Sequence, residues 1–80
     1  MNMSSLYDQA KAVVDSRGLL HKRYLEVLRL RIKTSAEDDL IAEINRMNNI
    51  DVLRALWEAG LSARLQQAVL DRVRLITGQR

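Results

Sequence analysis

The chain of 80 residues contains no cysteine, no proline and no phenylalanine, and its only histidine is His21. Without cysteine, it can form neither disulfides nor thiolate metal sites, and it has no thiol nucleophile. A single histidine leaves little from which a Ser/His/Asp triad or a zinc site could be built. The sequence also has no glycine-rich loop of the kind that cradles phosphates. We therefore predict a protein that is not an enzyme and that uses no cofactor, metal or small-molecule substrate.

Residues that interrupt helices are also scarce, because proline is absent and glycine occurs only three times. Hydrophobic residues make up 48% of the sequence, which is too many for an intrinsically disordered chain. No uncharged stretch approaches the ~18–20 apolar residues of a transmembrane helix. The N-terminal residues have neither a basic start nor an apolar run, so they do not resemble a secretory signal. We expect a cytoplasmic protein that does not associate with a membrane.

Apolar residues at helical spacing, separated by capping residues, predict five helices. The first is expected to begin at Ser4 or Ser5 and to stop at Gly18, and the second covers residues 19–33. Gly60 is expected to end the fourth helix in a Schellman motif. This pattern predicts an all-α fold, a compact bundle of four to five short helices, as a single domain over residues 1–80. The capping residues predicted at the starts of the last three helices are Thr34 or Ser35, Asn49 and Ser62.

Each predicted helix has an apolar side that we expect to face the core. Trp57 is expected to be a core anchor, with an exposed binding residue as the alternative. His21 is expected at the edge of the core, bonded to a neighbouring carbonyl. The core side predicted for residues 19–33 consists of Leu20, Tyr24, Leu25, Val27, Leu28 and Ile32.

Charge is distributed in bands along the chain. Residues 17–33 carry six Lys or Arg and one Glu, whereas residues 34–51 carry five Asp or Glu and one Arg. The acidic residues 37–39 directly follow a predicted cap, so we expect them to stabilise the start of the third helix and to offer the basic residues a counterpart. The basic side chains that lie away from the apolar side of the second helix are a candidate surface for a partner or for nucleic acid. They are Lys22, Arg23, Arg29 and Lys33.

Residues 53–73 resemble a DNA-binding helix-turn-helix, since a short helix and a Gly60-Leu61-Ser62 turn precede a longer helix. Arg64, Gln66 and Gln67 would lie near the front of that second helix, where their side chains could contact phosphates and base edges. Two positions depart from the motif. Leu56 stands where a small residue is favoured, and Gln66 stands where an apolar one is expected. Nucleic-acid binding is therefore the alternative function rather than the leading one.

Four leucines lie off the apolar sides of the two longest predicted helices. An 80-residue chain has a small core, and association with a second copy would bury additional apolar surface. We therefore expect a homo-oligomer, most simply a dimer. The leucines proposed for self-association are Leu19, Leu30, Leu70 and Leu75.

Residues 44–69, INRMNNIDVLRALWEAGLSARLQQAV, resemble helical C-terminal segments of bacterial transposase-like nucleases of the Rpn type. In those segments, a short helix with an Asp-x-Leu pattern precedes a turn of small residues and a final helix. The resemblance implies an accessory interaction module. It carries over no functional residues, because the carboxylate–lysine centre of the nuclease has no counterpart in this chain.

The leading hypothesis from the sequence is a small, non-enzymatic protein–protein interaction module that docks through an apolar helix face flanked by a basic band. The first alternative is a nucleic-acid-binding protein. The second is a phage- or plasmid-type inhibitor that occupies a site on another protein, which the size and the charge bands fit equally well.

Overall fold

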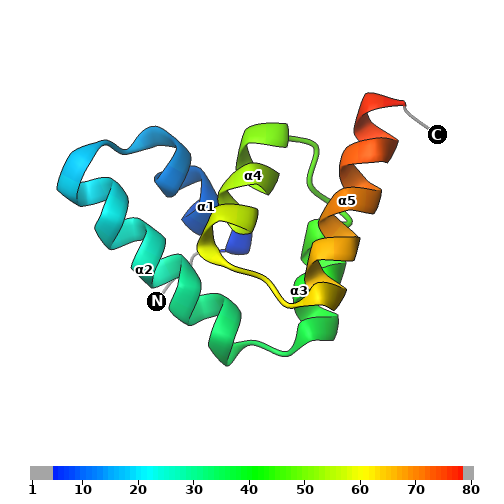
Figure 1. Cartoon of the computed structure of the whole chain (residues 1–80), viewed down its shortest axis with the longest axis horizontal. Coiled ribbons are helices and arrows are strands. Elements are labelled where there is room, and N and C mark those ends of the chain that lie inside the picture. Colours follow the sequence, from blue (N-terminus) through cyan, green and yellow to red (C-terminus); the bar gives the residue numbers. More distant parts are fainter. Residues whose placement is uncertain (1–4, 79–80) are drawn as a thin grey trace.

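Five helices joined by short connections make up the computed structural model, which describes residues 5–78 (Figure 1). The described residues contain no strand, so the predicted all-α fold is confirmed. The connections between successive helices are two, two, five and three residues long. The helices are α1 (Leu6–Asp15), α2 (Gly18–Thr34), α3 (Glu37–Ile44), α4 (Ile50–Ala59) and α5 (Ala63–Thr77).

Helix α4 lies in the middle of the molecule and separates two pairs of helices (Figure 1). On one side, α1 and α2 pack against each other and against α4. On the other side, α5 packs against both α3 and α4. One continuous apolar core joins all five helices. Its buried residues are Leu6, Ala10, Val13, Leu28, Leu40, Ile44, Met47, Val52, Leu53, Ala55, Leu56, Ala59, Leu65 and Val69.

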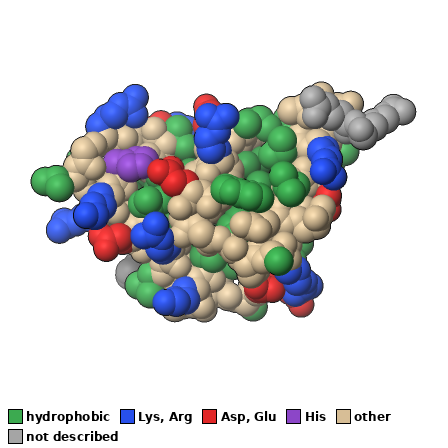
Figure 2. Space-filling view, viewed as in Figure 1, with side chains coloured by type: hydrophobic (Ala, Val, Ile, Leu, Met, Phe, Trp, Pro, Cys, Tyr) green, Lys and Arg blue, Asp and Glu red, His purple; other side chains and the backbone are tan. Residues whose placement is uncertain are grey.

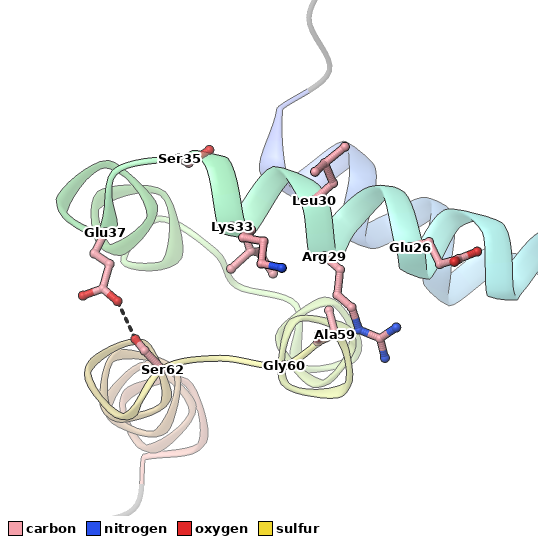
Figure 3. Close-up of a pocket in the computed structure, with 10 residues that line it drawn as sticks. Glu26, Arg29, Leu30, Lys33, Ser35, Glu37, Ala59, Gly60 and Ser62 are labelled. Carbon is pink, nitrogen blue, oxygen red and sulfur yellow. Dashed lines mark hydrogen bonds between the residues drawn. The ribbon is translucent and has the colours of Figure 1, made fainter.

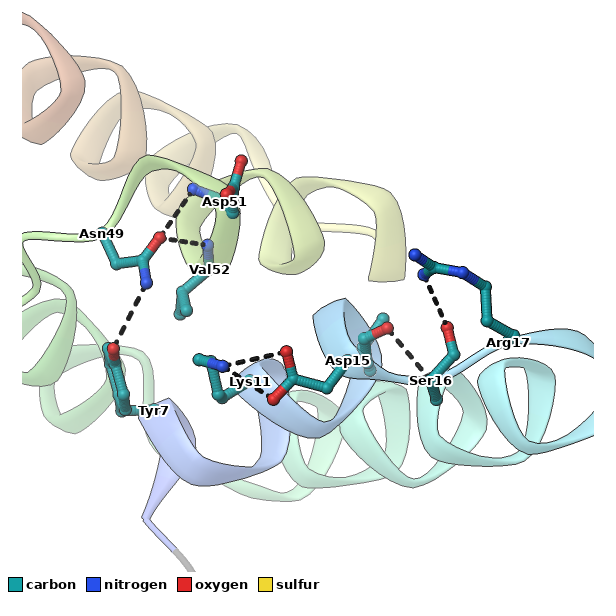
Figure 4. A network of polar contacts seen from close by, with 9 residues as sticks. Tyr7, Lys11, Asp15, Ser16, Arg17, Asn49, Asp51 and Val52 are labelled. Atoms are coloured by element: carbon teal, nitrogen blue, oxygen red, sulfur yellow. Dashed lines mark hydrogen bonds and ion pairs between the residues drawn. The ribbon is translucent and has the colours of Figure 1, made fainter.

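Three of the predicted helix starts are confirmed by side-chain caps. The Ser5 hydroxyl accepts the backbone N–H of Asp8 at 3.0 Å, and the Ser62 hydroxyl accepts the N–H three residues further on. Asn49 caps α4 by accepting two backbone N–H groups, and its amide also donates to the Tyr7 hydroxyl of α1 at 3.4 Å (Figure 4). Each cap satisfies donors that the first helical turn leaves free. Ser4, the alternative first cap, lies outside the described residues.

The predicted cap of α3 is wrong. Thr34 is the last residue of α2, and the Ser35 hydroxyl donates to the Arg31 carbonyl at 2.7 Å. Helix α3 therefore begins after Ala36, which has no side chain that could cap it. The acidic residues 37–39 do occupy the first turn of α3, as expected, where carboxylates stabilise the positive end of a helix.

Gly18 and Gly60 both have positive φ, but neither ends the preceding helix in the predicted way. Gly18 has φ +60° and begins α2, whereas the end of α1 is formed by Ser16, whose N–H and hydroxyl both donate to Val13. Gly60 has φ +101° and ψ +122°, which is not the left-handed helical conformation of a Schellman motif. The Gly60 N–H instead closes a tight turn onto the Trp57 carbonyl at 3.1 Å.

The predicted core side of α2 is only partly covered. Leu28 is its one buried residue, while Leu25 and Ile32 pack against the core and are half-buried. Leu20, Tyr24 and Val27 are exposed, which corrects the prediction for these positions. These side chains are exposed because of how the helices pack: α2 lies at the edge of the molecule and has neighbours on one side only (Figure 1).

Within residues 5–78, none of the helices combines the length and the apolarity that crossing a membrane requires.

Candidate functional site

The outer side of α2 carries a second set of apolar residues. Leu19 and Leu30 are 88% and 61% exposed, as their predicted position off the core side requires. Leu20, Val27 and Leu30 lie on one side of the helix, because their spacing of seven and then three residues returns to nearly the same direction. Arg23 lies between them. We call Leu20, Arg23, Val27 and Leu30 the α2 strip.

A second apolar surface lies between α4 and α5, where Figure 2 shows hydrophobic side chains gathered together. Here a groove of about 240 Å³ opens to solvent. Trp57 and Leu70 line it and are 40% and 39% exposed, so the prediction of Trp57 as a core anchor is wrong. We call this the α4–α5 groove. It is lined by Ile50, Leu53, Arg54 and Trp57 of α4 and by Val69, Leu70 and Val73 of α5.

The helices on either side of the groove run antiparallel. Arg72 of α5 donates to the Met47 carbonyl at 2.6 Å and to the Asn48 side chain at 2.7 Å, so the second half of α5 lies beside the start of α4. In a DNA-binding helix-turn-helix, the two helices cross at about 90–120° and diverge away from the turn. Figure 1 shows α5 turning back alongside α4, as in a helical hairpin.

Two of the three residues proposed for reading nucleic acid are bonded within the protein. Arg64 forms ion pairs with Asp38 at 2.6 Å and Glu37 at 3.6 Å, and its hydrogen bond to Asp38 raises the pKa of Arg64. Gln67 donates to Asp71, and Gln66 is half-buried. The acidic start of α3 thus neutralises α5 and does not pair with the basic residues of α2, in contrast to the expectation.

The four basic residues predicted as a surface on α2 fall into two groups. Arg29 donates from Nε to the Ala59 carbonyl at 2.9 Å, which ties α2 to the C-terminal end of α4. Lys22, Arg23 and Lys33 are exposed and form no hydrogen bond or ion pair with the part of the chain that the structure describes. Of the predicted surface, these three are available as cations for a partner.

A larger pocket of about 600 Å³ lies between α2, the end of α4 and the start of α5 (Figure 3). Arg29 and Lys33 line it together with Glu26 and Glu37, and the Ser62 hydroxyl donates to Glu37 at 2.6 Å. Two cations and two carboxylates give this pocket no preference for a charged ligand of either sign. It does not point to a particular ligand.

His21 lies at the edge of the core, as predicted. Its Nδ1 is 3.0 Å from the Val13 carbonyl oxygen, and its Nε2 is 3.6 Å from a carboxylate oxygen of Glu58. In residues 5–78, no three His, Asp or Glu side chains come together in a way that could hold a metal ion.

The proposed self-association leucines are all exposed, but the structure does not bring them together. Leu19 and Leu30 belong to α2 at one end of the molecule, whereas Leu70 and Leu75 belong to α5 at the other (Figure 1). Leu75 is 69% exposed and lies outside the lining of the groove.

Sequence reasoning missed Arg54 and the groove beside it. The available signal was that apolar residues occur on more than one side of α4. Ile50 and Trp57 lie on one side, while Val52 and Ala59 lie on another, and a helix with two apolar sides needs two neighbours or a partner.

No model of a known protein family matches the chain, and no curated protein and no solved structure matches it either. The resemblance of residues 44–69 to Rpn-type proteins therefore rests on the sequence pattern alone.

Proposed function

We propose that the protein is a small protein–protein interaction module that self-associates through the α2 strip. The observation that carries this proposal is the second apolar side of α2, which holds Leu20, Val27 and Leu30 in solvent while the opposite side packs on the core. Large apolar side chains gathered in solvent on one side of a helix are typical of interaction sites. Burying it would also add to the small core of an 80-residue chain.

Charges beside the α2 strip favour a second copy as the partner. Arg23 lies within the strip and Glu26 lies next to it, and neither has an ion-pair partner in residues 5–78. An antiparallel two-fold contact repeats each pairing twice. When Leu20 packs against Leu30 of the second copy, Arg23 comes within reach of the second copy's Glu26. The strip and the adjacent Glu26 are therefore complementary in charge to the same surface of a second copy.

Sedimentation velocity from low to high micromolar concentration tests this proposal. The chain is expected to shift from monomer to dimer over that range. Leu30→Gln should raise the dissociation constant about 10- to 100-fold, because each dimer loses two buried leucines. Leu75→Gln is the matched control, since it changes an equally exposed leucine on the far helix, and it should leave the constant unchanged. A strict monomer at high micromolar concentration would contradict the proposal.

Nucleic-acid binding is a second candidate function, supported by the three α2 cations that lack a partner in the described residues. Lys22, Arg23 and Lys33 lie on a helix surface that could follow a phosphate backbone. A titration with duplex DNA and single-stranded RNA at ~50 to ~200 mM salt tests it, since affinity that depends on phosphate contacts falls steeply with salt. Replacing all three with Gln should abolish binding, whereas Arg64→Gln should not. An absence of binding at the lowest salt removes this candidate.

A further inference from the structure

We propose that the α4–α5 groove binds an amphipathic helix of another protein, one that carries carboxylates beside its apolar residues. This inference deepens the proposed function by naming a partner class. It rests on the protein being an interaction module but uses a different surface from the α2 strip. A groove between two antiparallel helices is a common receptor for a third helix, whose apolar residues enter it at intervals of three and four.

The size and lining of the groove favour a helix side chain over a small molecule. Its volume of about 240 Å³ lies below the roughly 300–1,000 Å³ of typical small-molecule pockets. Leu53 forms a fully buried floor, while Trp57 and Leu70 form half-exposed walls. Trp and Arg are the residues most often found at the energetic centre of protein interfaces, and this groove contains one of each.

Arg54 gives the groove its charge preference. It lines the groove and forms no hydrogen bond or ion pair in residues 5–78. Asp51 and Glu58 flank Arg54 on the side that faces α1, but neither forms an ion pair with its guanidinium. Among the described residues, no acidic residue lines the groove itself. A carboxylate on the incoming helix would give Arg54 the partner that residues 5–78 do not supply, because a guanidinium binds carboxylates in a two-pronged geometry.

The same charge argues against a second copy as the occupant. A contact between two grooves would bring Arg54 toward Arg54 of the other molecule. The α2 strip would bring its own cation, Arg23, toward Arg54, and the carboxylate beside the strip, Glu26, is the one that pairs with Arg23 in the proposed dimer. The most acidic segment, at the start of α3, is engaged with Arg64 and Ser62. The occupant is therefore a helix from a different protein.

Trp57 makes the test direct, because it is the only tryptophan in the chain and lines the groove. The probes are two synthetic helical peptides that share leucines at spacings of three and four and differ only in having Glu or Lys at the flanking positions. The Glu peptide is expected to shift Trp57 fluorescence to the blue and to bind at least ~10-fold tighter than the Lys peptide at low salt. Arg54→Gln should remove most of that difference. Arg46→Gln should preserve it, because Arg46 lies outside the groove and, like Arg54, has no side-chain hydrogen bond or ion pair within residues 5–78.

Each other outcome overturns the inference in a different way. Equal binding of the two peptides would exclude a carboxylate-bearing partner, and no binding of either would exclude the groove as a helix site. A blue shift on concentrating the protein alone would identify a second copy as the occupant. Leu30→Gln separates this inference from the proposed dimer, because that variant should lose self-association and still bind the Glu peptide. Failure of peptide binding with self-association intact would overturn this inference only.

Discussion

Helices α4 and α2 differ strongly in burial. Five of the ten residues of α4 are buried, whereas only one of the seventeen residues of α2 is. Helix α2 is nonetheless the longer and the richer in leucine. The difference arises from position, because α4 packs against α1, α2 and α5, while α2 packs mainly against α1.

This comparison separates the residues that hold the fold together from those that are available for binding. Buried α4 side chains stabilise the monomer, while the apolar side chains of α2 remain in solvent. The α4–α5 groove is intermediate in burial between these two surfaces, since Trp57 lines it and is 40% exposed. We therefore expect substitutions in α4 to change stability and substitutions in α2 to change association.

The largest expected effect is that of removing a buried leucine from α4. Leu56 is fully buried, so Leu56→Ala should lower the free energy of unfolding by about 2–5 kcal/mol through lost burial and the cavity left behind. Leu30→Ala in α2 should change it by less than about 0.5 kcal/mol at concentrations where the chain is monomeric. Urea denaturation measures both values. Equal losses would show that α2 contributes to the core as much as α4 does.

A smaller effect is expected at the ion pair that fastens α2 to the rest of the molecule. Arg31 donates to Glu43 at 3.2 Å and to Gln9 at 3.3 Å, and Glu43 also accepts the Leu6 N–H at the start of α1. Arg31→Met keeps the apolar part of the side chain but should lower stability by about 1.5–3 kcal/mol, because these hydrogen bonds involve charged groups. Arg46→Met is the control, because Arg46 is exposed and its side chain forms no hydrogen bond or ion pair within residues 5–78. Thermal unfolding of the two variants measures the difference. The proposed anchoring would be refuted if both variants unfolded at the same temperature.

The smallest expected effect comes from comparing Ser62, which caps a helix, with Thr34, which was predicted to cap a helix but does not. Ser62→Ala should lower the free energy of unfolding by about 1 kcal/mol, because Ser62 caps α5. Thr34→Ala should leave it unchanged or raise it slightly, since the Thr34 hydroxyl donates back to the Leu30 and Arg31 carbonyls within α2 and caps no helix. Chemical denaturation of the two variants side by side measures the difference. A loss at Thr34 as large as that at Ser62 would contradict the assignment.

Features that depend on neighbouring residues were predictable from the sequence. The caps at Ser5, Asn49 and Ser62 involve backbone groups only two or three residues away, so the local sequence is sufficient to place them. The apolar spacing of helices α3 and α5 was sufficient too, since Leu40 and Leu65 are buried as expected. The presence of five helices follows from the same local signals.

Features that depend on which helices become neighbours were not predictable in this way. Helical periodicity shows that α2 has an apolar side, but it does not show how much of that side another helix will cover, so Val27 was wrongly assigned to the core. Arg29 looked like a free surface cation because its acceptor, the Ala59 carbonyl, lies 30 residues away in sequence. Trp57 and Arg54 came to line a groove only because α5 folds back alongside α4.

The two-residue connection between α1 and α2 also bears on the order in which the chain folds. Closing this hairpin costs little loop entropy, whereas bringing α4 against α1 must close the intervening residues 16–49. We expect the hairpin to form early and to remain incomplete until α4 docks, because α1 packs against both α2 and α4. We expect the arrival of α4 to be the slowest step of folding and φ-values to be higher in α1 and α2 than in α5.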